Sequence, residues 1–119
     1  MMIKLELTED QARLVANACE FYARIRMGQF GEIFRQCTGK IWAAFPESAT
    51  LDMLKFRKHI YPDLTGVGHS YGIGRFDDAD NTYDVYQAIR YAMDGKEPFS
   101  YNKLPICTKE DDYEDTSRR

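Results

Sequence analysis

The stretch Leu7–Phe30, LTEDQARLVANACEFYARIRMGQF, decides the expected fold, because it contains the start, the periodic apolar face and the end of a helix. Thr8 and Gln11 have the spacing of a capping box, in which each side chain bonds the backbone N–H of the other residue. Apolar residues then recur at three- and four-residue steps: Leu14, Val15, Ala18, Tyr22 and Ile25. This spacing predicts an amphipathic helix with that face in the core.

The pattern continues beyond Phe30, but Gly28 and Gly31 interrupt it. Each glycine weakens a helix by about 1 kcal/mol relative to alanine. We therefore expect a kink, a break or a close backbone contact at these glycines. The sequence TGK at residues 38–40 should end the element.

Further along the chain, residues 49–60 predict a helix with Met53, Phe56 and Ile60 on one side. Residues 61–74 are rich in turn residues and predict a loop. A last helix should start near residue 80 or 81, where aspartate and asparagine are both suited to cap it. Its predicted apolar stripe is Val85, Ile89, Ala92 and Met93.

Two short segments predict extended structure. Residues 2–7, MIKLEL, alternate in polarity and predict a half-buried strand, and residues 98–107 predict an edge strand or extended segment. The expected fold class is therefore α+β: a small single domain, mostly helical, with a short N-terminal strand and few other strands. We expect one ligand-binding domain over residues 1–108 and a disordered acidic tail over residues 109–119.

Composition limits the class of protein. The chain has 119 residues, of which 44% are hydrophobic and 13% aromatic, so it can build one core and is not a disordered chain. No apolar run reaches the length of about 18–20 residues that a membrane span needs. Charges inside the only apolar stretch of the first ten residues argue against a secretory signal, so we expect a cytoplasmic protein. The three cysteines are odd in number and widely spaced, which favours buried reduced thiols over disulfides.

The net charge is −3, yet residues 20–60 hold seven basic and four acidic side chains. This middle region is too weakly basic for general DNA binding, which usually shows a strongly basic domain. It is sufficiently basic for a small anionic ligand. Within it, Arg24 and Arg26 project to different sides of their helix among aromatic neighbours, which suggests either an oligomer interface or an anion pocket.

A second stretch, Gly68–Tyr91, GHSYGIGRFDDADNTYDVYQAIRY, combines glycines, an arginine and an acidic cluster. A calcium loop starting at Asp78 needs glycine at its sixth and glutamate at its twelfth position, where Tyr83 and Ile89 stand. The acidic cluster therefore fits an ordinary helix N-terminus better than a metal site.

The glycines of this stretch let the backbone approach a ligand, and Arg75 offers a guanidinium fork for phosphate. Tyr71 and Phe76 are suited to stack on a base, although they equally fit a turn closed by aromatic packing. Tyr83, Gln87 and Arg90 share one helix face, which suits either nucleotide recognition, an ordinary solvated face or a subunit contact. His59 and His69 lack partners at a spacing typical of catalysis, so an enzyme is not favoured.

The stretches Leu7–Phe30 and Gly68–Tyr91 resemble the Thoeris anti-defence family of the first type, a family of small phage proteins, and the likeness spans roughly residues 2–94. The resemblance implies a protein of the host bacterial cytoplasm that binds and sequesters cyclic ADP-ribose isomers without cleaving them. Some family members also capture cyclic oligonucleotides of CBASS defence, so cyclic di- or trinucleotides are further candidate ligands. Family members form homo-oligomers, from dimers to hexamers, with ligand pockets at subunit contacts.

Within the resembling segments, we chose candidate ligand residues by their chemistry. The candidates for adenine and ribose are Tyr71, Phe76 and Asn81, and those for phosphate and hydroxyl groups are Arg75, Gln87 and Arg90. Arg57 is a further phosphate candidate. A second, oligomer-formed pocket is expected at Arg24, Arg26 and Gln29.

We expect no catalytic activity, no cofactor, no metal, no polymeric nucleic acid and no membrane as partner. Two other functions remain open. The protein could be a phage protein-binding module that inhibits a host protein directly, or a nucleotide-cleaving enzyme. Recovery of unchanged ligand separates a sequestering protein from an enzyme, and the absence of any nucleotide binding favours the direct inhibitor.

Overall fold

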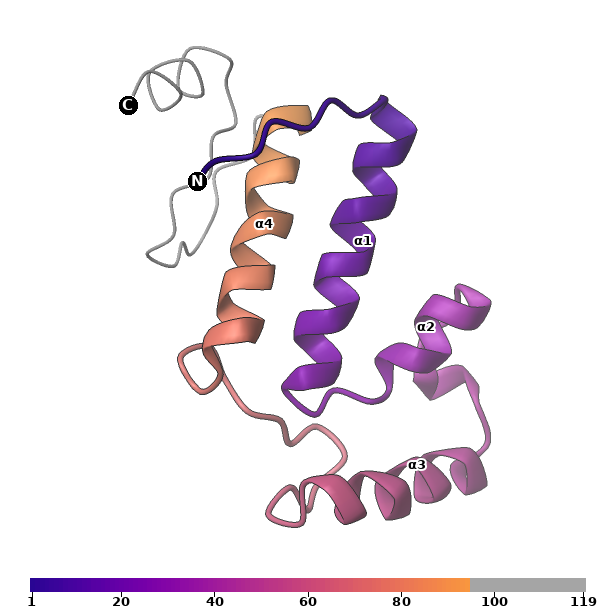
Figure 1. Ribbon diagram of the computed structural model, residues 1–119. Helices are drawn as coiled ribbons and strands as arrows, with labels where there is room; N and C mark the ends of the chain where they lie inside the picture. The colour runs from indigo at the N-terminus through magenta and orange to yellow at the C-terminus, as the bar shows by residue number, and fades with distance from the viewer. Residues whose placement is uncertain (95–119) are drawn as a thin grey trace. The chain divides into compact units, whose positions relative to one another are not determined.

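The computed structural model describes residues 1–94 of the chain, and these form helices and loops (Figure 1). The elements are α1 (Glu9–Arg26), α2 (Glu32–Thr38), the short 3-10 helix η1 (Trp42–Ala44), α3 (Glu47–Ile60) and α4 (Asp77–Asp94). No strand occurs within residues 1–94. The α+β prediction is therefore wrong, and the described part of the chain is mostly helical.

The predicted N-terminal strand is absent because residues 2–7 have no partner strand in the described part of the chain. A strand needs hydrogen bonds from a neighbour as well as an alternating pattern. Ile3 and Leu5, which were expected to face a core, are 78% and 73% exposed. The predicted extended segment 98–107 and the tail 109–119 lie outside the described residues.

The start of α1 confirms the capping box. The backbone N–H of Thr8 donates to Gln11 Oε1 at 3.0 Å, and the N–H of Gln11 donates to Thr8 Oγ1 at 3.1 Å. These two bonds satisfy N–H groups that the first turn of a helix cannot pair internally. The local sequence around Thr8 is therefore sufficient to place this end of the helix.

The predicted buried face of α1 is wrong. The buried positions are Ala16, Glu20 and Ala23, which follow at four- and three-residue steps, whereas Leu14 is 69% exposed and Tyr22 is also exposed. Periodicity shows that a helix has a face, but the elements packed against the helix decide which face is covered. Small alanine side chains on the covered face allow neighbouring elements to approach closely.

The chain divides into two compact units. The predicted ligand-binding domain over residues 1–108 extends beyond the described residues and stays a prediction. Among the described residues, the first unit comprises Met1–Glu20 and residues 80–94, and the second comprises Phe21–Ala79. In the first unit, the early turns of α1 lie beside α4, which runs in the opposite direction (Figure 1). Consistent with this direction, the charge of Asp94, at the end of α4, contributes to the raised pKa of Arg13, after the larger effect of a hydrogen bond to Glu9.

Helix α4 begins at Asp77, three or four residues earlier than predicted. Its buried residues in the first unit are Asp84, Gln87 and Ala88 rather than the predicted apolar stripe. Burial, followed by the nearby Glu20 carboxylate, raises the pKa of the Tyr86 hydroxyl. The first unit thus buries several polar side chains as well as small apolar ones.

The second unit is organised around the turn that ends α1. Gly28 has a φ of +90°, a conformation that favours glycine, and the helix stops at Arg26. The prediction of a break at the glycines is confirmed. Helix α2 ends as expected at Thr38, followed by Gly39 in the left-handed conformation.

Three consecutive carbonyl groups of this turn accept hydrogen bonds from residues far along the chain. The Tyr61 hydroxyl donates to Arg26 O at 2.7 Å, and the Tyr71 N–H donates to Met27 O at 2.8 Å. Arg57 Nη1 donates to Gly28 O at 3.4 Å. The end of a helix leaves carbonyls without internal partners, and here α3 and the loop after it supply the donors.

None of the helices in residues 1–94 has the combination of length and apolar composition that crossing a membrane requires. The two described cysteines, Cys19 and Cys37, are free thiols. Cys19 is half-buried, but Cys37 is exposed, so the prediction of buried thiols is wrong for Cys37. The sulfur of Cys37 lies on the short helix α2, which contains no buried residue.

Candidate functional site

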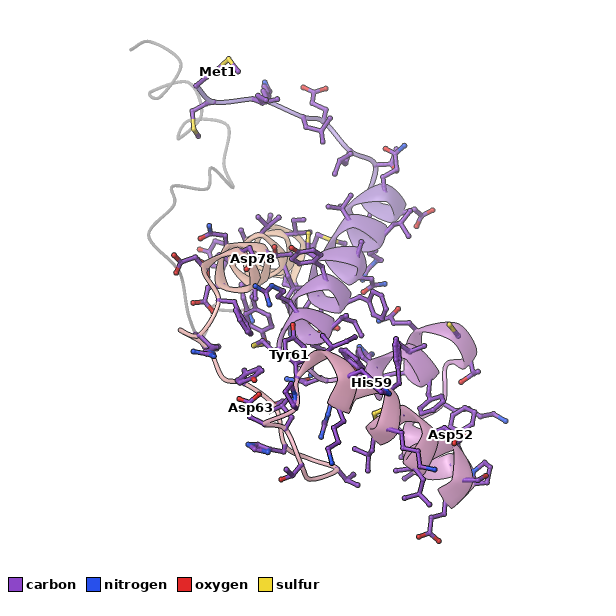
Figure 2. The ribbon with its side chains drawn as sticks, turned by 60° about the horizontal axis from the view of Figure 1, so that its bottom comes forward. Met1, Asp52, His59, Tyr61, Asp63 and Asp78 are labelled. Atoms are coloured by element: carbon purple, nitrogen blue, oxygen red, sulfur yellow. The ribbon has the colours of Figure 1, made fainter. Side chains whose placement is uncertain are left out.

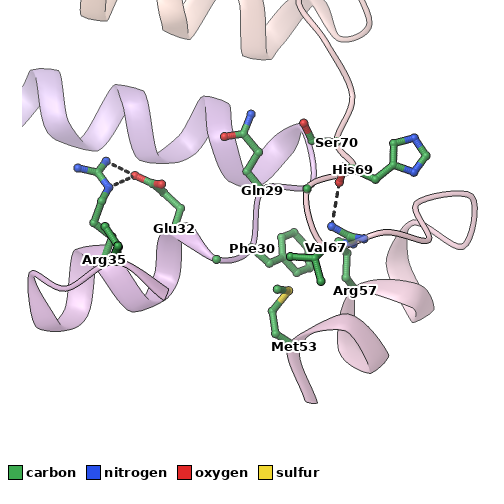
Figure 3. Close-up of a pocket in the computed structure, with 12 residues that line it drawn as sticks. Gln29, Phe30, Glu32, Arg35, Met53, Arg57, Val67, His69 and Ser70 are labelled. Carbon is green, nitrogen blue, oxygen red and sulfur yellow. Dashed lines mark hydrogen bonds and ion pairs between the residues drawn. The ribbon is translucent and has the colours of Figure 1, made fainter. Parts of the chain in front are cut away.

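The second unit contains a cavity of about 440 Å³ that combines polar and apolar walls, and we call it the polar pocket (Figure 3). Its volume lies in the range of about 300–1,000 Å³ that is typical of small-molecule sites. The turn after α1, helix α2, helix α3 and the loop at residues 67–70 supply its walls. The lining residues are Gln29, Phe30, Gly31, Glu32, Arg35, Ile41, Met53, Arg57, Val67, Gly68, His69 and Ser70.

Arg57 lies in the wall of the polar pocket and is only 1% exposed. Its guanidinium donates to three backbone carbonyls: Gly66 O at 2.6 Å, His69 O at 2.9 Å and Gly28 O at 3.4 Å. Burial lowers the pKa of Arg57 from its ordinary value. Arg57 was predicted to bind a phosphate. Its Nη groups instead join the turn after α1, at Gly28, to the loop after α3, at Gly66 and His69.

Gln29 lines the polar pocket at the point where the chain leaves the turn after α1. Arg24 Nη1 donates to Gln29 Oε1 at 2.9 Å. The structure thus brings together two of the three residues predicted for a second pocket, Arg24 and Gln29. The third residue, Arg26, makes its contacts in a different cluster, described below.

Glu32 and Arg35 form an ion pair on α2 at the edge of the polar pocket (Figure 3). Arg35 Nε donates to Glu32 Oε1 at 2.6 Å, and Arg35 Nη2 contacts the same oxygen. The Arg35 side chain is 42% exposed, so solvent and ligand can reach its guanidinium. The Glu32 side chain is only 11% exposed, so a ligand would meet the pair from the side of the Arg35 guanidinium.

His69 and Ser70 line the opposite side of the polar pocket, on the loop after α3 (Figure 3). The backbone N–H of Thr65 donates to His69 Nδ1 at 3.3 Å. Because Nδ1 accepts this bond, the neutral imidazole carries its proton on Nε2 and offers a donor there. The loop histidine therefore bonds the backbone of its own loop, at Thr65.

A second group of residues, which we call the aromatic–arginine cluster, comprises Tyr61, Tyr71, Phe76, Arg26 and Arg75. The Tyr71 and Phe76 ring centroids are 5.3 Å apart and nearly perpendicular, and the Tyr61 and Tyr71 centroids are also 5.3 Å apart. The Arg26 guanidinium lies 3.7 Å from the Phe76 centroid. Arg75 lies 5.0 Å from the Tyr71 centroid and 5.5 Å from that of Phe76.

Carboxylates occupy the edges of this cluster (Figure 2). The Tyr71 hydroxyl donates to Asp63 Oδ1 at 2.5 Å, which lowers the pKa of Asp63 and raises that of Tyr71. Asp78 Oδ2 accepts from the Tyr22 hydroxyl at 2.7 Å and from Arg26 Nε at 3.1 Å. These two bonds, the one from Tyr22 first, lower the pKa of Asp78.

The structure therefore brings together the predicted ligand residues Tyr71, Arg75 and Phe76, with Arg26 beside them. Their rings and guanidinium groups mainly contact one another. This arrangement fits the second interpretation of the sequence, a turn closed by aromatic packing, as well as it fits a base-stacking site. The cluster shares no lining residue with the polar pocket.

The remaining predicted ligand residues lie on α4 in the first unit. Gln87 is only 3% exposed, so its amide is not available on an open surface. The Arg90 guanidinium lies 5.3 Å from the Tyr86 ring centroid, and Asn81 is half-buried. The predicted set of ligand residues is thus divided between two separate units.

Sequence reasoning missed several residues of the polar pocket, among them Arg35, Ser70, Phe30 and Met53. Arg35 had a usable signal, since a basic residue three positions after Glu32 predicts a pair on one helix face. Ser70 lies inside the glycine-rich loop but was not singled out. Nothing in the sequence places Met53 beside Phe30, because this contact joins distant segments.

An apolar groove of about 580 Å³ lies beside the polar pocket in the second unit and shares Phe30 and Met53 with it. Its lining residues are Ile25, Phe30, Ile33, Phe34, Ala49, Asp52, Met53, Phe56 and Ile60. Phe56 is 54% exposed and Ile60 is 50% exposed. The three residues predicted to share one side of α3, Met53, Phe56 and Ile60, do so in this groove.

Comparisons with protein-family models, curated proteins and solved structures find no match to this chain. Within residues 1–94, no group of three or more histidine, cysteine, aspartate or glutamate side chains is arranged to hold a metal ion. A pocket with exposed donors at one side and aromatic and aliphatic side chains at the other suits a ligand with an anionic and a flat apolar part.

Proposed function

We propose that the protein binds a small phosphate-containing nucleotide in the polar pocket and sequesters it intact. The supporting observation is the composition of this cavity, in which Arg35, Gln29, His69 and Ser70 can offer hydrogen-bond donors to phosphate oxygens. Phe30 and the neighbouring Met53 offer an apolar wall for a base. Pockets with a few placed polar groups on an otherwise apolar lining are typical of small-molecule sites.

Cyclic ADP-ribose isomers are the leading ligands of this proposal, because the sequence resembles the Thoeris anti-defence family of the first type. In that function, a phage protein removes the host's immune signal in the bacterial cytoplasm without cleaving it. Cyclic di- and trinucleotides are the further candidates that the resemblance implies. Arg35, whose guanidinium is accessible and can donate to a phosphate beside Glu32, is the residue on which the proposal depends most.

The same proposal includes a homo-oligomer. The apolar groove exposes Phe56, Ile60 and Ile33 together, and large exposed apolar surfaces are typical of interaction sites. A second copy of the chain would remove this surface from water. The groove also fits the alternative function, a module that inhibits a host protein directly, so the binding experiment has to distinguish the two.

The experiment is isothermal titration of the purified protein with cyclic ADP-ribose isomers and with cyclic di- and trinucleotides. The variant Arg35→Gln should bind the ligand at least about tenfold more weakly, because a charge-assisted hydrogen bond is worth about 1.5–3 kcal/mol. Arg13→Gln is the matched control, since Arg13 also pairs with a carboxylate on its own helix but does not line the pocket. Its affinity should equal that of the wild type.

Three outcomes separate the functions. Binding that weakens in Arg35→Gln but not in Arg13→Gln, with ligand of unchanged mass recovered after denaturation, supports sequestration. Recovery of a cleaved ligand shows an enzyme. If no nucleotide binds the wild-type protein, the proposal is wrong and direct inhibition of a host protein is favoured. Sedimentation of the same samples measures whether the protein is a homo-oligomer.

A further inference from the structure

Arg57 carries a buried charge without an acidic partner in the described part of the chain. The residue is 1% exposed, and its hydrogen-bond acceptors, Gly28 O, Gly66 O and His69 O, are all backbone carbonyls. Its Nε has no hydrogen-bond partner, and none of the ion pairs within residues 1–94 includes it. Buried charges in proteins are normally paired, so this arginine needs an explanation.

The three carbonyls bind the guanidinium of Arg57 but carry no net charge. Burial lowers the pKa of Arg57, and no neighbouring carboxylate counteracts that effect. An arginine nevertheless stays protonated in proteins, so a full positive charge lies in the wall of the polar pocket. Charges interact more strongly in the low dielectric of a protein interior than in water. The charge therefore acts on a group in the pocket whether or not an N–H of Arg57 points there.

The other charged side chains of the polar pocket do not neutralise Arg57. They are Glu32 and Arg35, which pair with each other on α2 (Figure 3). Two arginines, one glutamate and a neutral histidine give the lining a formal charge of +1. A concave site lined by one sign of charge attracts ligands of the opposite sign.

We propose that the buried charge of Arg57, acting without a direct bond, selects an anionic group for the polar pocket. The inference rests on the proposed nucleotide site and adds the residue that gives this site its preference for a phosphate or another anion. A negative charge in the pocket, from a ligand or from a substituted side chain, should stabilise the folded protein for the same reason. Arg57 thus links occupation of the pocket to the stability of the fold.

A carboxylate introduced into the pocket tests this role without any ligand. Ser70 lines the pocket and directly follows His69, whose carbonyl accepts from Arg57. Ser70→Asp should unfold about 4 °C above Ser70→Asn, its uncharged match in size, because the carboxylate shares the pocket with a buried cation. If Ser70→Asp is no more stable than Ser70→Asn, the inference is wrong.

The same comparison in two further backgrounds identifies the cation responsible. In Arg57→Gln, the difference between aspartate and asparagine at residue 70 should disappear, whereas in Arg35→Gln it should persist. Survival of the difference in Arg57→Gln would overturn the inference. Loss of the difference in both backgrounds would assign the effect to the total charge of the pocket, and the specific role of Arg57 would be wrong.

If Arg57→Gln does not fold, the effect of an anion on thermal unfolding decides instead. Pyrophosphate should raise the unfolding temperature of the wild type above that in sodium chloride of equal ionic strength. It should still do so in Arg35→Gln, because Arg57 remains. Absence of the rise in the wild type, or its complete loss in Arg35→Gln, contradicts the inference.

Failure of the inference and failure of the proposed function give different results. If cyclic ADP-ribose isomers bind but the difference at residue 70 persists in Arg57→Gln, the nucleotide site stands and only the role of Arg57 is wrong. If pyrophosphate stabilises the protein while no nucleotide binds, the pocket is an anion site and the proposed function is wrong.

Discussion

Arg57 and Arg26 belong to the same unit, and both were predicted to contact a ligand, yet the structure uses them in different ways. Arg57 is almost completely buried and donates to the carbonyls of Gly28, Gly66 and His69. Arg26 is half-buried and bonds Asp78 and the Tyr61 hydroxyl while stacking on Phe76. The first arginine joins backbone segments, whereas the second joins side chains near solvent.

The difference teaches how burial changes the energetic role of one residue type. Removing a buried charged group leaves its partners without hydrogen bonds in a place that water does not reach, which costs about 3–5 kcal/mol. Removing one member of an exposed ion pair costs at most about 1 kcal/mol, because water replaces the partner. We therefore expect Arg57 to control folding and Arg26 to affect stability only slightly.

The largest effect is expected for Arg57→Met, which keeps the length of the side chain but removes the donor to the carbonyls of Gly28 and His69 and one of the two donors to Gly66 O. This substitution should lower the free energy of unfolding by about 4 kcal/mol. Urea denaturation followed by circular dichroism measures the loss. Lys58→Met is the matched control, because Lys58 is the exposed neighbour on the same helix and its replacement should change stability by less than about 0.5 kcal/mol. Equal losses in the two variants would show that the carbonyl contacts of Arg57 do not stabilise the fold.

The next effect concerns Gly28, whose carbonyl is one of the three that Arg57 holds. An alanine there would adopt a φ near +90° and place its Cβ 2.3 Å from Leu64 Cδ1, and Leu64 is buried. Gly39, with a φ of +74°, has no atom within 4 Å of such a Cβ.

Gly39→Ala should therefore lower the free energy of unfolding by about 1 kcal/mol, the cost of a left-handed backbone for alanine. Gly28→Ala should lower it by about 2–3 kcal/mol, because overpacking against Leu64 adds to the backbone cost. Parallel urea titrations of the two variants measure the difference. If Gly39→Ala destabilises the protein as much as Gly28→Ala, then the contact with Leu64 contributes nothing.

The sequence predicted the parts of the fold whose partners are close together in the chain. Thr8 and Gln11 are three residues apart, and Gly28 ends its own helix, so both could be predicted correctly. The buried face of α1 could not, because its covering elements come from elsewhere in the chain. The strand at residues 2–7 failed for the same reason, since it needs a partner that the pattern of alternation does not supply.

The candidate site shows the same limit. Tyr71, Arg75 and Phe76 are near neighbours in sequence, and they do form one cluster. Arg57 was recognised as a guanidinium suited to oxygen acceptors, but its acceptors are backbone carbonyls, 9 to 29 residues away. A carbonyl has no sequence signature, because every residue carries one. A structural arginine of this kind is therefore indistinguishable from a ligand-binding arginine until the loops are placed.

The smallest effect is expected at the aromatic–arginine cluster, where Asp78 accepts bonds from Tyr22 and Arg26. The bond from Tyr22, followed by that from Arg26, lowers the pKa of Asp78 in the folded protein below its ordinary value of 3.8. A carboxylate with a lowered pKa stabilises the fold above its ordinary pKa, and this stabilisation is lost as the pH falls through the folded value. Asp78→Asn should therefore be slightly less stable than the wild type at pH 7 and lose less stability on acidification.

Tyr22→Phe sharpens this prediction, because it removes the main donor to Asp78 while leaving the carboxylate and Arg26 in place. Its loss of stability between pH 6 and about pH 2, measured by urea denaturation at each pH, should lie between those of the wild type and Asp78→Asn. The hydrogen-bonded Asp63 remains in all three proteins, so some acid sensitivity should persist in each. If Asp78→Asn loses stability as steeply as the wild type, the cluster contributes nothing to acid sensitivity. Its arginine and rings would then hold the loop through packing alone.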